Sequence, residues 1–374
     1  MTQTTVAIVG GGLAGLRAAR GLNEAGIDFV LFEARDRLGG RILTVDATGQ
    51  PCEDGFDLGP SWFWPRAQPA MQTLVAELGL AAFCQASDGD VMFERMSREA
   101  PLRYRATGGD PASMRLVGGT GVLVQALARD LPREKILLGT RVSELALTSA
   151  GVALRVTRGS APAEIFTARK AILAVPPRLL EATISFSPNL DPATARLWRE
   201  TPTWMAPTAK FVALFDHAFW RDAGLSGTAQ SLVGPLAEMH DASTASGRAA
   251  LFGFLGVGAD QRAIHGPKAL EQACLVQLGR IFGPKALAPS ATLFKDWTAD
   301  ALTATDRDRG AASHIDARPV PWLAPPWRER LALAASETSA SEPGYLAGAV
   351  DAAQRAVADM LGDIFNGQHG RPLQ

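Results

Sequence analysis

The hydrophobic pattern at the start of the chain predicts a strand, a helix and a second strand in close succession. Val6–Val9 is an apolar run without polar alternation, which is typical of a central parallel strand covered on both faces. Apolar positions then recur at helical spacing from Leu16 onward, and Gly26 is expected to end that helix. A second apolar run, Asp28–Phe32, leads directly to Glu33. Together these segments predict a complete βαβ unit.

The turn between the first strand and the helix has the sequence Gly10-Gly-Gly-Leu-Ala-Gly15. In this pattern Gly10 permits a tight turn, Gly12 lets the backbone approach a pyrophosphate, and Gly15 lets the helix pack closely on its strand. The helix N-terminus attracts a phosphate, and Glu33, 18 residues after Gly15, can accept hydrogen bonds from ribose hydroxyls. We therefore predict a dinucleotide-binding unit; the alternative is a glycine-rich turn that holds no ligand.

Four later segments give further signals of secondary structure. Val122–Leu131 has helical spacing, and Lys135–Val142 is predicted as a strand. Lys170–Pro177 is predicted as a buried strand that ends at prolines, and Ala209–Phe215 as a largely apolar strand with Lys210 near its start. A lysine in such a strand is seldom buried without a partner or a task, although its ammonium can also reach solvent from the strand end.

Composition limits the classes of protein that this chain can belong to. The 374 residues are 47% hydrophobic and 20% charged, which suffices for one large core or for two cores that share an interface. The 37 basic and 38 acidic residues show no long runs of either sign, so we expect a small, weakly charged partner rather than nucleic acid or an anionic membrane. No basic leader precedes the first strand and no apolar run approaches ~18 residues, so a cytoplasmic protein without a membrane anchor is expected.

The cysteines and histidines favour neither a disulfide framework nor a metal site. The number of cysteines is odd, no CxxC pair occurs, and the histidines lie too far apart in the sequence for a ligand set. We expect buried free thiols and ordinary surface or core histidines. The residues concerned are Cys52, Cys84, Cys274, His217, His240 and His265.

From Ala34 onward the sequence resembles the flavin-containing monoamine oxidase family. The segment from Glu33 to Arg41 reads Glu-Ala-Arg-Asp-Arg-Leu-Gly-Gly-Arg. In that family the Glu-Ala-Arg part holds the adenosine ribose of FAD, and the Gly-Gly-Arg turn brings backbone and a guanidinium against the pyrophosphate and the ribityl chain. The resemblance gives these roles to Glu33, Arg35, Gly40 and Arg41, while a solvated loop charge is the alternative for either arginine.

Two further parts of the chain resemble family segments that contact FAD. Asp57–Trp62 resembles the segment whose backbone lies along the isoalloxazine ring, with Gly59 removing a side chain where the ring must approach. The resemblance carries over Gly59, Ser61 and Trp62 as FAD contacts, although Trp62 could equally be a core or interface aromatic. Further along, Val142 holds the position that contacts the adenine.

The resemblance also implies a catalytic centre. Lys210 corresponds to the family's lysine that holds a water over flavin N5. Tyr345 corresponds to one aromatic of the substrate cage, with a plain packing role as the alternative. The helix that follows Tyr345 points its N-terminus at the flavin, where partial positive charge stabilises the anionic reduced ring. The further FAD contacts that the resemblance implies are Trp297, Glu337, Gly344 and Leu346.

The chain departs from the family in two places. Where some members carry a cysteine bonded to the flavin and a tyrosine beside it, this chain has Thr305–Asp308, so we expect FAD to be bound noncovalently. The second wall of the usual two-aromatic cage is then missing or supplied elsewhere, for instance by His314 or Trp322. Only about fifty residues separate Trp62 from Gly118, fewer than in the larger eukaryotic members, so we expect a more open cavity.

The resemblance is nearly full length and implies an α/β fold. A Rossmann-like FAD-binding domain of the amine oxidase type is expected beside a mixed-sheet α+β substrate domain, with the active site where the two meet. The expected FAD-binding domain comprises residues 1–65, 113–185 and 318–366, and the expected substrate domain comprises residues 66–112 and 186–317.

The implied activity is FAD-dependent oxidation of a primary or secondary amine to an imine. The imine hydrolyses to an aldehyde and ammonia or a smaller amine, while O2 is reduced to H2O2. The partners are then a small-molecule amine and dioxygen, and a homodimer is compatible with the resemblance. Two alternatives stay open: FAD-dependent desaturation or oxidation of a non-amine substrate, and a non-catalytic flavoprotein that serves as a partner subunit. A nicotinamide dehydrogenase fits less well, because the later motifs match flavin contacts.

Overall fold

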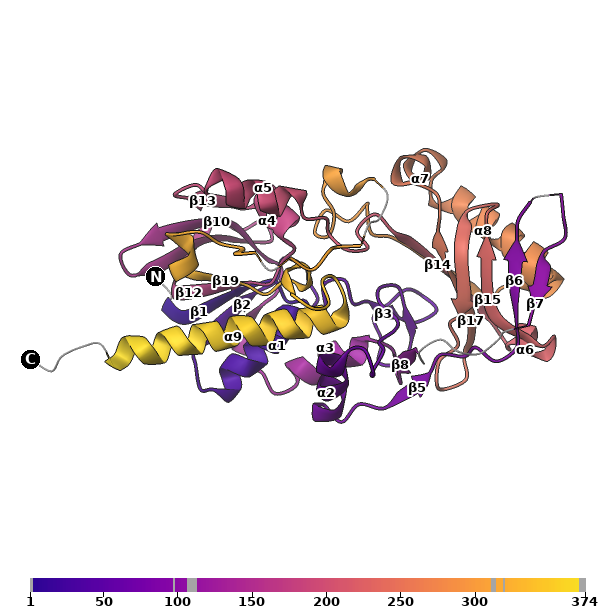
Figure 1. Ribbon diagram of the computed structural model, residues 1–374, viewed down its shortest axis with the longest axis horizontal. Coiled ribbons are helices and arrows are strands. Elements are labelled where there is room, and N and C mark those ends of the chain that lie inside the picture. The colour runs from indigo at the N-terminus through magenta and orange to yellow at the C-terminus, as the bar shows by residue number, and fades with distance from the viewer. Residues whose placement is uncertain (1–2, 97, 106–112, 311–313, 319, 370–374) are drawn as a thin grey trace, which may run out of the picture.

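The computed structural model is elongated, with two β-sheets side by side along its long axis (Figure 1). We call each sheet, together with the helices packed on it, the first body and the second body in chain order. The structure describes residues 3–96, 98–105, 113–310, 314–318 and 320–369. The predicted class, a Rossmann-like α/β body beside a mixed-sheet body, is confirmed.

The first body is organised around β1 (Gln3–Val9) and β2 (Phe29–Phe32), which pair in parallel as the sequence predicts. Val6 and Ile8 belong to one apolar cluster and Ala7 to another, because alternate residues of a strand point to opposite faces. Both faces are therefore covered, which explains the unbroken apolar run. The sheet order is β13-β10-β11-β12-β1-β2-β9, with β19 beside β12, and its other strands are β9 (Ile136–Leu137), β10 (Thr140–Thr148), β11 (Gly151–Arg158), β12 (Glu164–Leu173), β13 (Ser185–Ser187) and β19 (Leu331–Leu333).

Helices cover both faces of the first sheet. α1 (Leu13–Glu24) follows the glycine turn and ends just before Gly26, whose φ of 68° stops the helix as predicted. It packs along α9 (Leu346–His369), the long helix beside the first sheet in Figure 1. α2 packs on α9, and α5 packs on α4. The other helices of this body are α2 (Pro69–Glu77), α3 (Gly121–Ala128), α4 (Pro177–Thr183) and α5 (Pro192–Glu200).

The second body has one sheet face covered by a helix and the other turned toward the first body. On β14 (Ala209–Phe215), Phe211 packs in the cluster beneath α8 (Pro267–Phe282), whereas Val212 belongs to a cluster with Phe56 and Leu58, which lie between β2 and α2 of the first body in the chain. Lys210 shares the face of Val212, so it points at the first body. The sheet order is β18-β14-β17-β16-β15-β6-β7, and the remaining elements are β6 (Asp90–Glu94), β7 (Leu102–Tyr104), β15 (Leu225–Ser231), β16 (Leu236–Asp241), β17 (Ala249–Leu255), β18 (Ala291–Asp296), α6 (Phe219–Asp222) and α7 (Ala259–His265).

Short elements connect the larger ones. Among the helices in the part of the chain that the structure describes, none combines the length and apolar character that crossing a bilayer requires. The short strands and 3₁₀ turns are β3 (Thr44–Val45), β4 (Phe56–Asp57), β5 (Ala82–Cys84), β8 (Met114–Leu116), η1 (Arg133–Lys135), η2 (Pro284–Leu287), η3 (Asp306–Asp308), η4 (Trp327–Glu329) and η5 (Ser336–Thr338).

One predicted strand is wrong in its extent. The segment Lys135–Val142 is not a single strand, because β9 ends at Leu137 and β10 starts only at Thr140. Between them Gly139 turns the chain with a φ of 61°. The N–H of Thr140 donates to the carbonyl of Glu33 at 2.8 Å, so this turn is held at the end of β2.

The prediction that all three thiols are buried is also wrong. Cys274 lies on the buried face of α8, where burial raises the pKa of its thiol to about 12. Cys52 is half-buried, and Cys84 is exposed at the end of β5, a short strand that pairs only with β8 in the described sheet.

Candidate active site

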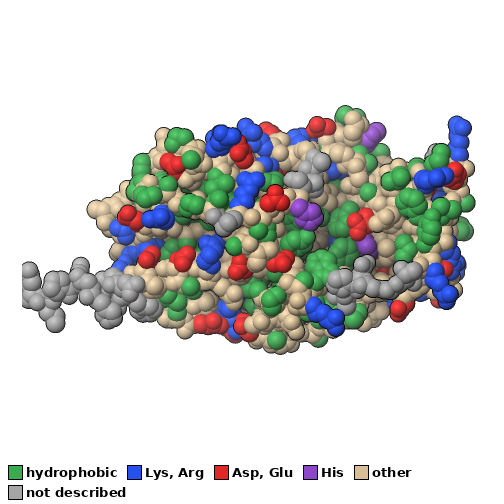
Figure 2. All heavy atoms as spheres, in the orientation of Figure 1, with side chains coloured by type: hydrophobic (Ala, Val, Ile, Leu, Met, Phe, Trp, Pro, Cys, Tyr) green, Lys and Arg blue, Asp and Glu red, His purple; other side chains and the backbone are tan. Residues whose placement is uncertain are grey.

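A cavity of about 600 Å³ runs between the two bodies, from the glycine turn after β1 to the start of β14. Figure 2 shows that this face of the molecule is hollowed between the bodies, with hydrophobic side chains gathered in the hollow. Most of the site residues predicted from the sequence line this cavity. They are Gly10, Gly12, Glu33, Arg35, Gly40, Arg41, Gly59, Ser61, Trp62, Val142, Lys210, Trp297, Gly344, Tyr345 and Leu346.

The glycine turn shapes one end of the cavity. Gly10 has a φ of 103°, and a Cβ on Gly15 would lie 1.8 Å from the carbonyl oxygen of Gly10, so α1 could not approach its strand with a larger residue there. Gly12 is less crowded, because a Cβ there would come no closer than 3.9 Å, an ordinary van der Waals distance, to the backbone of Gly39 and Gly40. α1 begins at Leu13 without a side-chain cap, so its first N–H groups are left for an anion such as a phosphate.

Glu33 is fixed on the cavity wall beside this turn. Its side chain is buried, and its two oxygens accept hydrogen bonds from the N–H groups of Gly11 and Arg35, each at 2.7 Å. Val142 lines the cavity near it. Each carboxylate oxygen keeps acceptor capacity for a ribose hydroxyl. The open cradle at Gly12, the uncapped helix and this carboxylate together fit the phosphates and ribose of a dinucleotide such as FAD.

Arg35 is neither a solvated charge nor a free cation. Its guanidinium donates to both carboxylate oxygens of Asp300, at 2.9 and 3.0 Å, and to the hydroxyl of Thr303 at 2.9 Å. Burial alone would raise the pKa of Asp300, but Arg35 and Lys295 lower it overall. This ion pair joins the ribose end of the cavity to the loop after β18.

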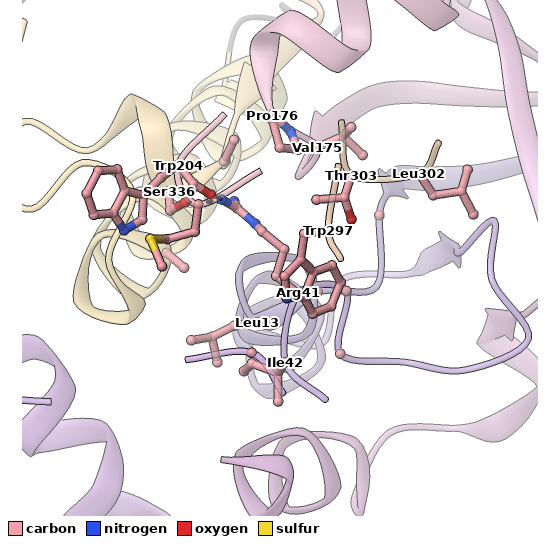
Figure 3. Close-up of a pocket in the computed structure, with 18 of the residues that line it drawn as sticks. Leu13, Arg41, Ile42, Val175, Pro176, Trp204, Trp297, Leu302, Thr303 and Ser336 are labelled. Atoms are coloured by element: carbon pink, nitrogen blue, oxygen red, sulfur yellow. Dashed lines mark hydrogen bonds between the residues drawn. The ribbon is translucent and has the colours of Figure 1, made fainter. Parts of the chain in front are cut away.

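Arg41 and Glu337 form a second ion pair at the middle of the cavity. The Nη1 of Arg41 donates to Glu337 Oε1 at 2.7 Å and to the carbonyl of Trp204 at 2.8 Å. Figure 3 shows Arg41 reaching between Trp297 on one side and Trp204 and Ser336 on the other. The Glu337 side chain is fully buried behind the lining, so it acts on the cavity through Arg41.

Lys210 is the buried cation at the second body's end of the cavity. It is 2% exposed, and its Nζ donates to Ser61 Oγ at 2.7 Å and to the carbonyl of Gly59 at 3.1 Å. The ammonium also lies 4.2 Å from the ring centre of Phe252. Burial lowers the pKa of Lys210 to about 7, and the Asp57 carboxylate opposes part of that shift. The prediction of a buried lysine with partners is confirmed, and the solvent-reaching alternative is wrong.

Gly59 lines the cavity, and the protein backbone already requires a glycine there. A Cβ would lie 2.0 Å from the carbonyl oxygen of Arg41, so the absent side chain makes room for protein backbone, while the approach of the ring stays a prediction. Ser61 serves as the acceptor for Lys210. The indole of Trp62 packs edge-on against His240 at 4.8 Å and donates to Gln85 at 2.7 Å.

The second predicted tryptophan is held by a backbone acceptor. The indole N–H of Trp297 donates to the carbonyl of Leu58 at 3.0 Å, and the ammonium of Lys295 lies 4.5 Å from its ring centre. Downstream, Asp308 is buried and pairs with Arg178 at 2.6 Å. The stretch 305–308 therefore serves the structure, and no cysteine lines the cavity among the residues that the structure describes.

Three aromatic side chains surround Tyr345. Trp64 meets its ring edge-on at 6.1 Å, Trp204 lies 5.9 Å away at an interplanar angle of 45°, and His314 stacks at 6.2 Å. Of the two residues considered for the second cage wall, His314 lines the cavity. Trp322 is not among the lining residues; it packs at the apolar cluster that contains Trp198 and Trp327.

Among the lining residues that sequence reasoning did not propose for the site are Trp204 and Glu238. Trp204 sits in an irregular loop before β14, where no periodicity marks it. Glu238 is opposite Phe254 in the β16–β17 register, and Phe254 is opposite Lys210, so strand alternation could have placed Glu238 on the cavity face. Its carboxylate accepts from His240 at 2.6 Å, and this bond lowers the pKa of Glu238.

Comparisons with protein families agree with this geometry. The model of the flavin containing amine oxidoreductases matches residues 81–361, and the model of the NAD(P)-binding Rossmann-like domain matches residues 8–78. A Mycobacterium tuberculosis protein assigned as a flavin-containing monoamine oxidase is 27% identical over 453 aligned positions, which cover 95% of this chain and 96% of that protein. An L-amino acid dehydrogenase of Synechocystis is 30% identical over 52% of this chain and 40% of its own length.

Solved structures share the fold at low sequence identity. A redesigned putrescine oxidase superposes with a TM-score of 0.81 at 22% identity, covering 96% of this chain and 99% of that chain. The cyclohexylamine oxidase of Brevibacterium oxydans superposes with a TM-score of 0.78 at 22% identity, covering 97% and 99%. These likenesses show the architecture that places the cavity between two bodies.

Proposed function

The chain belongs to the family of flavin-containing amine oxidoreductases, and from this membership we propose that it uses noncovalently bound FAD to oxidise primary or secondary amines. The proposed products are an imine, which hydrolyses to an aldehyde and ammonia or a smaller amine, and hydrogen peroxide from dioxygen. FAD, when bound, accepts the electrons of the amine's α C–H bond and passes them to dioxygen.

The observation that carries the proposal is the continuity of one cavity from Gly12 and Glu33 to Lys210 and Tyr345. The first pair lies where the phosphates and ribose of FAD fit. The second pair lies at the other body, where a small substrate can reach the same cavity. A dinucleotide and an amine therefore have adjoining places in a single space.

Gly12, Gly40 and the start of α1 would hold the pyrophosphate, with Glu33 on the ribose. We propose that Arg41, fixed by Glu337, adds its positive charge at the middle of the cavity. Trp297 and Leu346 line the wall beyond it. We also propose that the first body is the FAD-binding domain. The residue limits expected for that domain stay a prediction; α2 and α5 lie outside these limits but pack on helices of the first body.

Lys210 and Tyr345 are the proposed catalytic residues. With a pKa of about 7, Lys210 is partly uncharged at neutral pH and can donate to and accept from a water molecule, which we propose it positions beside the substrate. Partial burial raises the pKa of the Tyr345 phenol, so its O–H stays a hydrogen-bond donor that can orient the amine nitrogen.

The chemistry of the described lining supports the proposal that FAD is attached noncovalently. A covalent link to the flavin through cysteine needs a thiol at the cavity, and the described lining contains none. Acid precipitation of the purified protein should therefore release all flavin into the supernatant. Flavin that stays in the pellet would contradict this part of the proposal.

An anaerobic titration of the yellow protein with primary amines, secondary amines and polyamines tests the function. We expect the amine to bleach the flavin absorbance at roughly 450 nm. Admission of air should then restore the absorbance and release peroxide. Bleaching by a non-amine alone would favour a desaturase or another oxidase. A flavin that only dithionite reduces, in a protein that purifies with a second subunit, would favour a non-catalytic flavoprotein.

A further inference from the structure

The loop 201–208 before β14 holds one residue in an unusual backbone conformation. Among the described residues other than glycine, Met205 alone has a positive φ, of 61°. A side chain with a Cβ is disfavoured in this left-handed region, so the surrounding contacts must hold the backbone there. Trp204 immediately precedes Met205, and both residues line the cavity.

Trp204 is fixed by its main chain to the Arg41–Glu337 ion pair. Its carbonyl accepts from Arg41 at 2.8 Å, and its N–H donates to Glu337 Oε1 at 3.2 Å. Both bonds belong to the peptide backbone, so they do not depend on the indole. The loop is thereby attached to the part of the cavity where FAD fits, while the side chain stays available for another role.

The indole itself rests on a glycine. A Cβ on Gly344 would lie 2.6 Å from the Cβ of Trp204, and Gly344 has a φ of 87°. The next residue is Tyr345, whose ring lies 5.9 Å from the indole, while His314 lies 4.3 Å from it on the outer side. The position of the indole is therefore set by the glycine and by two aromatic neighbours.

We propose that Trp204 is a specificity-determining residue that supplies the aromatic wall beside Tyr345, where this chain has no tyrosine at 305–308. The inference rests on the proposed oxidation of amines and names the part of the substrate that this wall contacts. His314 backs the indole from the exposed side. The substrate class is an amine whose nitrogen-bearing carbon carries a bulky apolar group, since an indole face offers a large apolar area.

Benzylamine and methylamine are suitable probes, because both are primary amines and only benzylamine carries a bulky apolar group. The variants are Trp204→Ala and Trp204→Phe, with Trp322→Phe as the matched control outside the cavity. Binding is measured by anaerobic titration calorimetry, and flavin reduction by rapid mixing. Flavin content per protein is measured for every variant.

We expect Trp204→Ala to weaken benzylamine binding at least tenfold and to change methylamine binding less than twofold. Trp204→Phe should restore most of the affinity, and Trp322→Phe should match the wild type. Flavin content should stay at the wild-type level, because the bonds to Arg41 and Glu337 are made by the backbone.

Three results would overturn the inference. They are equal weakening of both amines, unchanged benzylamine binding in Trp204→Ala, and loss of flavin from both Trp204 variants, which would assign the indole to cofactor retention. If the wild type binds benzylamine but no amine of the earlier panel reduces its flavin, the proposed function fails while the binding comparison still decides the role of Trp204. If the wild type binds neither probe, the inference about Trp204 fails, and the panel of amines decides the proposed function separately.

Discussion

The two ends of the cavity are built by different means. At the glycine turn, Gly10, Gly12 and Gly15 act through backbone shape, and Glu33 follows them within one βαβ unit. At the β14 end, the lining side chains come from segments that are far apart in the chain. The difference teaches that a site made of backbone geometry leaves a local pattern in the sequence, whereas a site assembled from separate loops does not.

The ends also differ in charge. The glycine end offers partial positive charge from α1 and one fixed carboxylate, which suits a constant ligand. The β14 end holds a single buried ammonium with a lowered pKa, aromatic rings and the Glu238 carboxylate. Changes at the first end should therefore remove the cofactor, and changes at the second should alter the reaction or the choice of substrate.

The largest effect is expected at Gly15. Gly15→Ala would place a Cβ 1.8 Å from the Gly10 carbonyl oxygen, so α1 must move away from the phosphate cradle. We expect at least about 3 kcal/mol of destabilisation and loss of bound FAD, measured by denaturant unfolding and by flavin content. Gly258→Ala is the control, because nothing lies within 4 Å of a Cβ there. Full flavin content in Gly15→Ala would show that close helix packing is not required.

The next effect concerns Lys210 and leaves the cofactor in place. Lys210→Met should slow turnover or flavin reoxidation roughly 10- to 100-fold, because the group that positions the water is lost. Flavin content should not change, since the nucleotide end is untouched. Lys268→Met, on the exposed side of α8, is the control. Unchanged steady-state rates would remove Lys210 from the mechanism.

The same variant has an expected dependence of stability on pH. The pKa of Lys210 falls from 10.5 to about 7 on folding, so between these values the unfolded chain binds more protons and the wild type gains stability as pH rises. Lys210→Met lacks this contribution. The free energy of unfolding of Lys210→Met minus that of the wild type should be greatest at pH 7 and below. Above pH 7 this difference should decline by up to about 1.4 kcal/mol per pH unit. Denaturant unfolding from pH 6 to 9 checks this, and a difference that stays flat would contradict the lowered pKa.

The smallest effect is expected at Glu238. Its carboxylate lines the cavity and is about half exposed, so it should attract a cationic substrate only moderately. Glu238→Gln should raise the KM for a diamine roughly two- to fivefold, with a smaller rise for a monoamine and a weaker effect in high salt. Asp222→Asn is the control, because the side chain of Asp222 is exposed at the end of α6. An equal rise for both substrates at every salt concentration would mean that the charge of Glu238 is not what matters.

The nucleotide end could be predicted from the sequence because its parts are contiguous. The strand and the helix were placed by hydrophobic periodicity, and the turn and Glu33 by the glycine motif and its spacing. The resemblance added Arg41 and gave Lys210, already noted in an apolar strand, its role. The partners of these side chains could not be predicted, since Asp300 and Glu337 reach them only through the tertiary fold. The role of each proposed site residue stays a prediction until the variants are measured.

The substrate end was predicted only in part, for a physical reason. Tyr345 and His314 were considered as walls of the substrate cage, but Trp204 was missed. Its position depends on the positive φ of Met205 and on the close contact of its side chain with Gly344. A loop with irregular backbone leaves no periodic pattern of hydrophobic positions in the sequence. The break between β9 and β10 was also missed, although Gly139, with a φ of 61°, is a glycine within a strand pattern, which can indicate a turn.

The position of β19 and α9 has a consequence for how the protein is made. β19 pairs with β12, and α9 packs along α1, so the last-synthesised part of the first body completes a sheet that began with β1. A ribosome must therefore finish nearly the whole chain before this layer can close. The glycine turn emerges early, whereas Leu346, which lines the same cavity at the start of α9, emerges late, so we expect firm capture of the vitamin-derived cofactor only after α9 has been made.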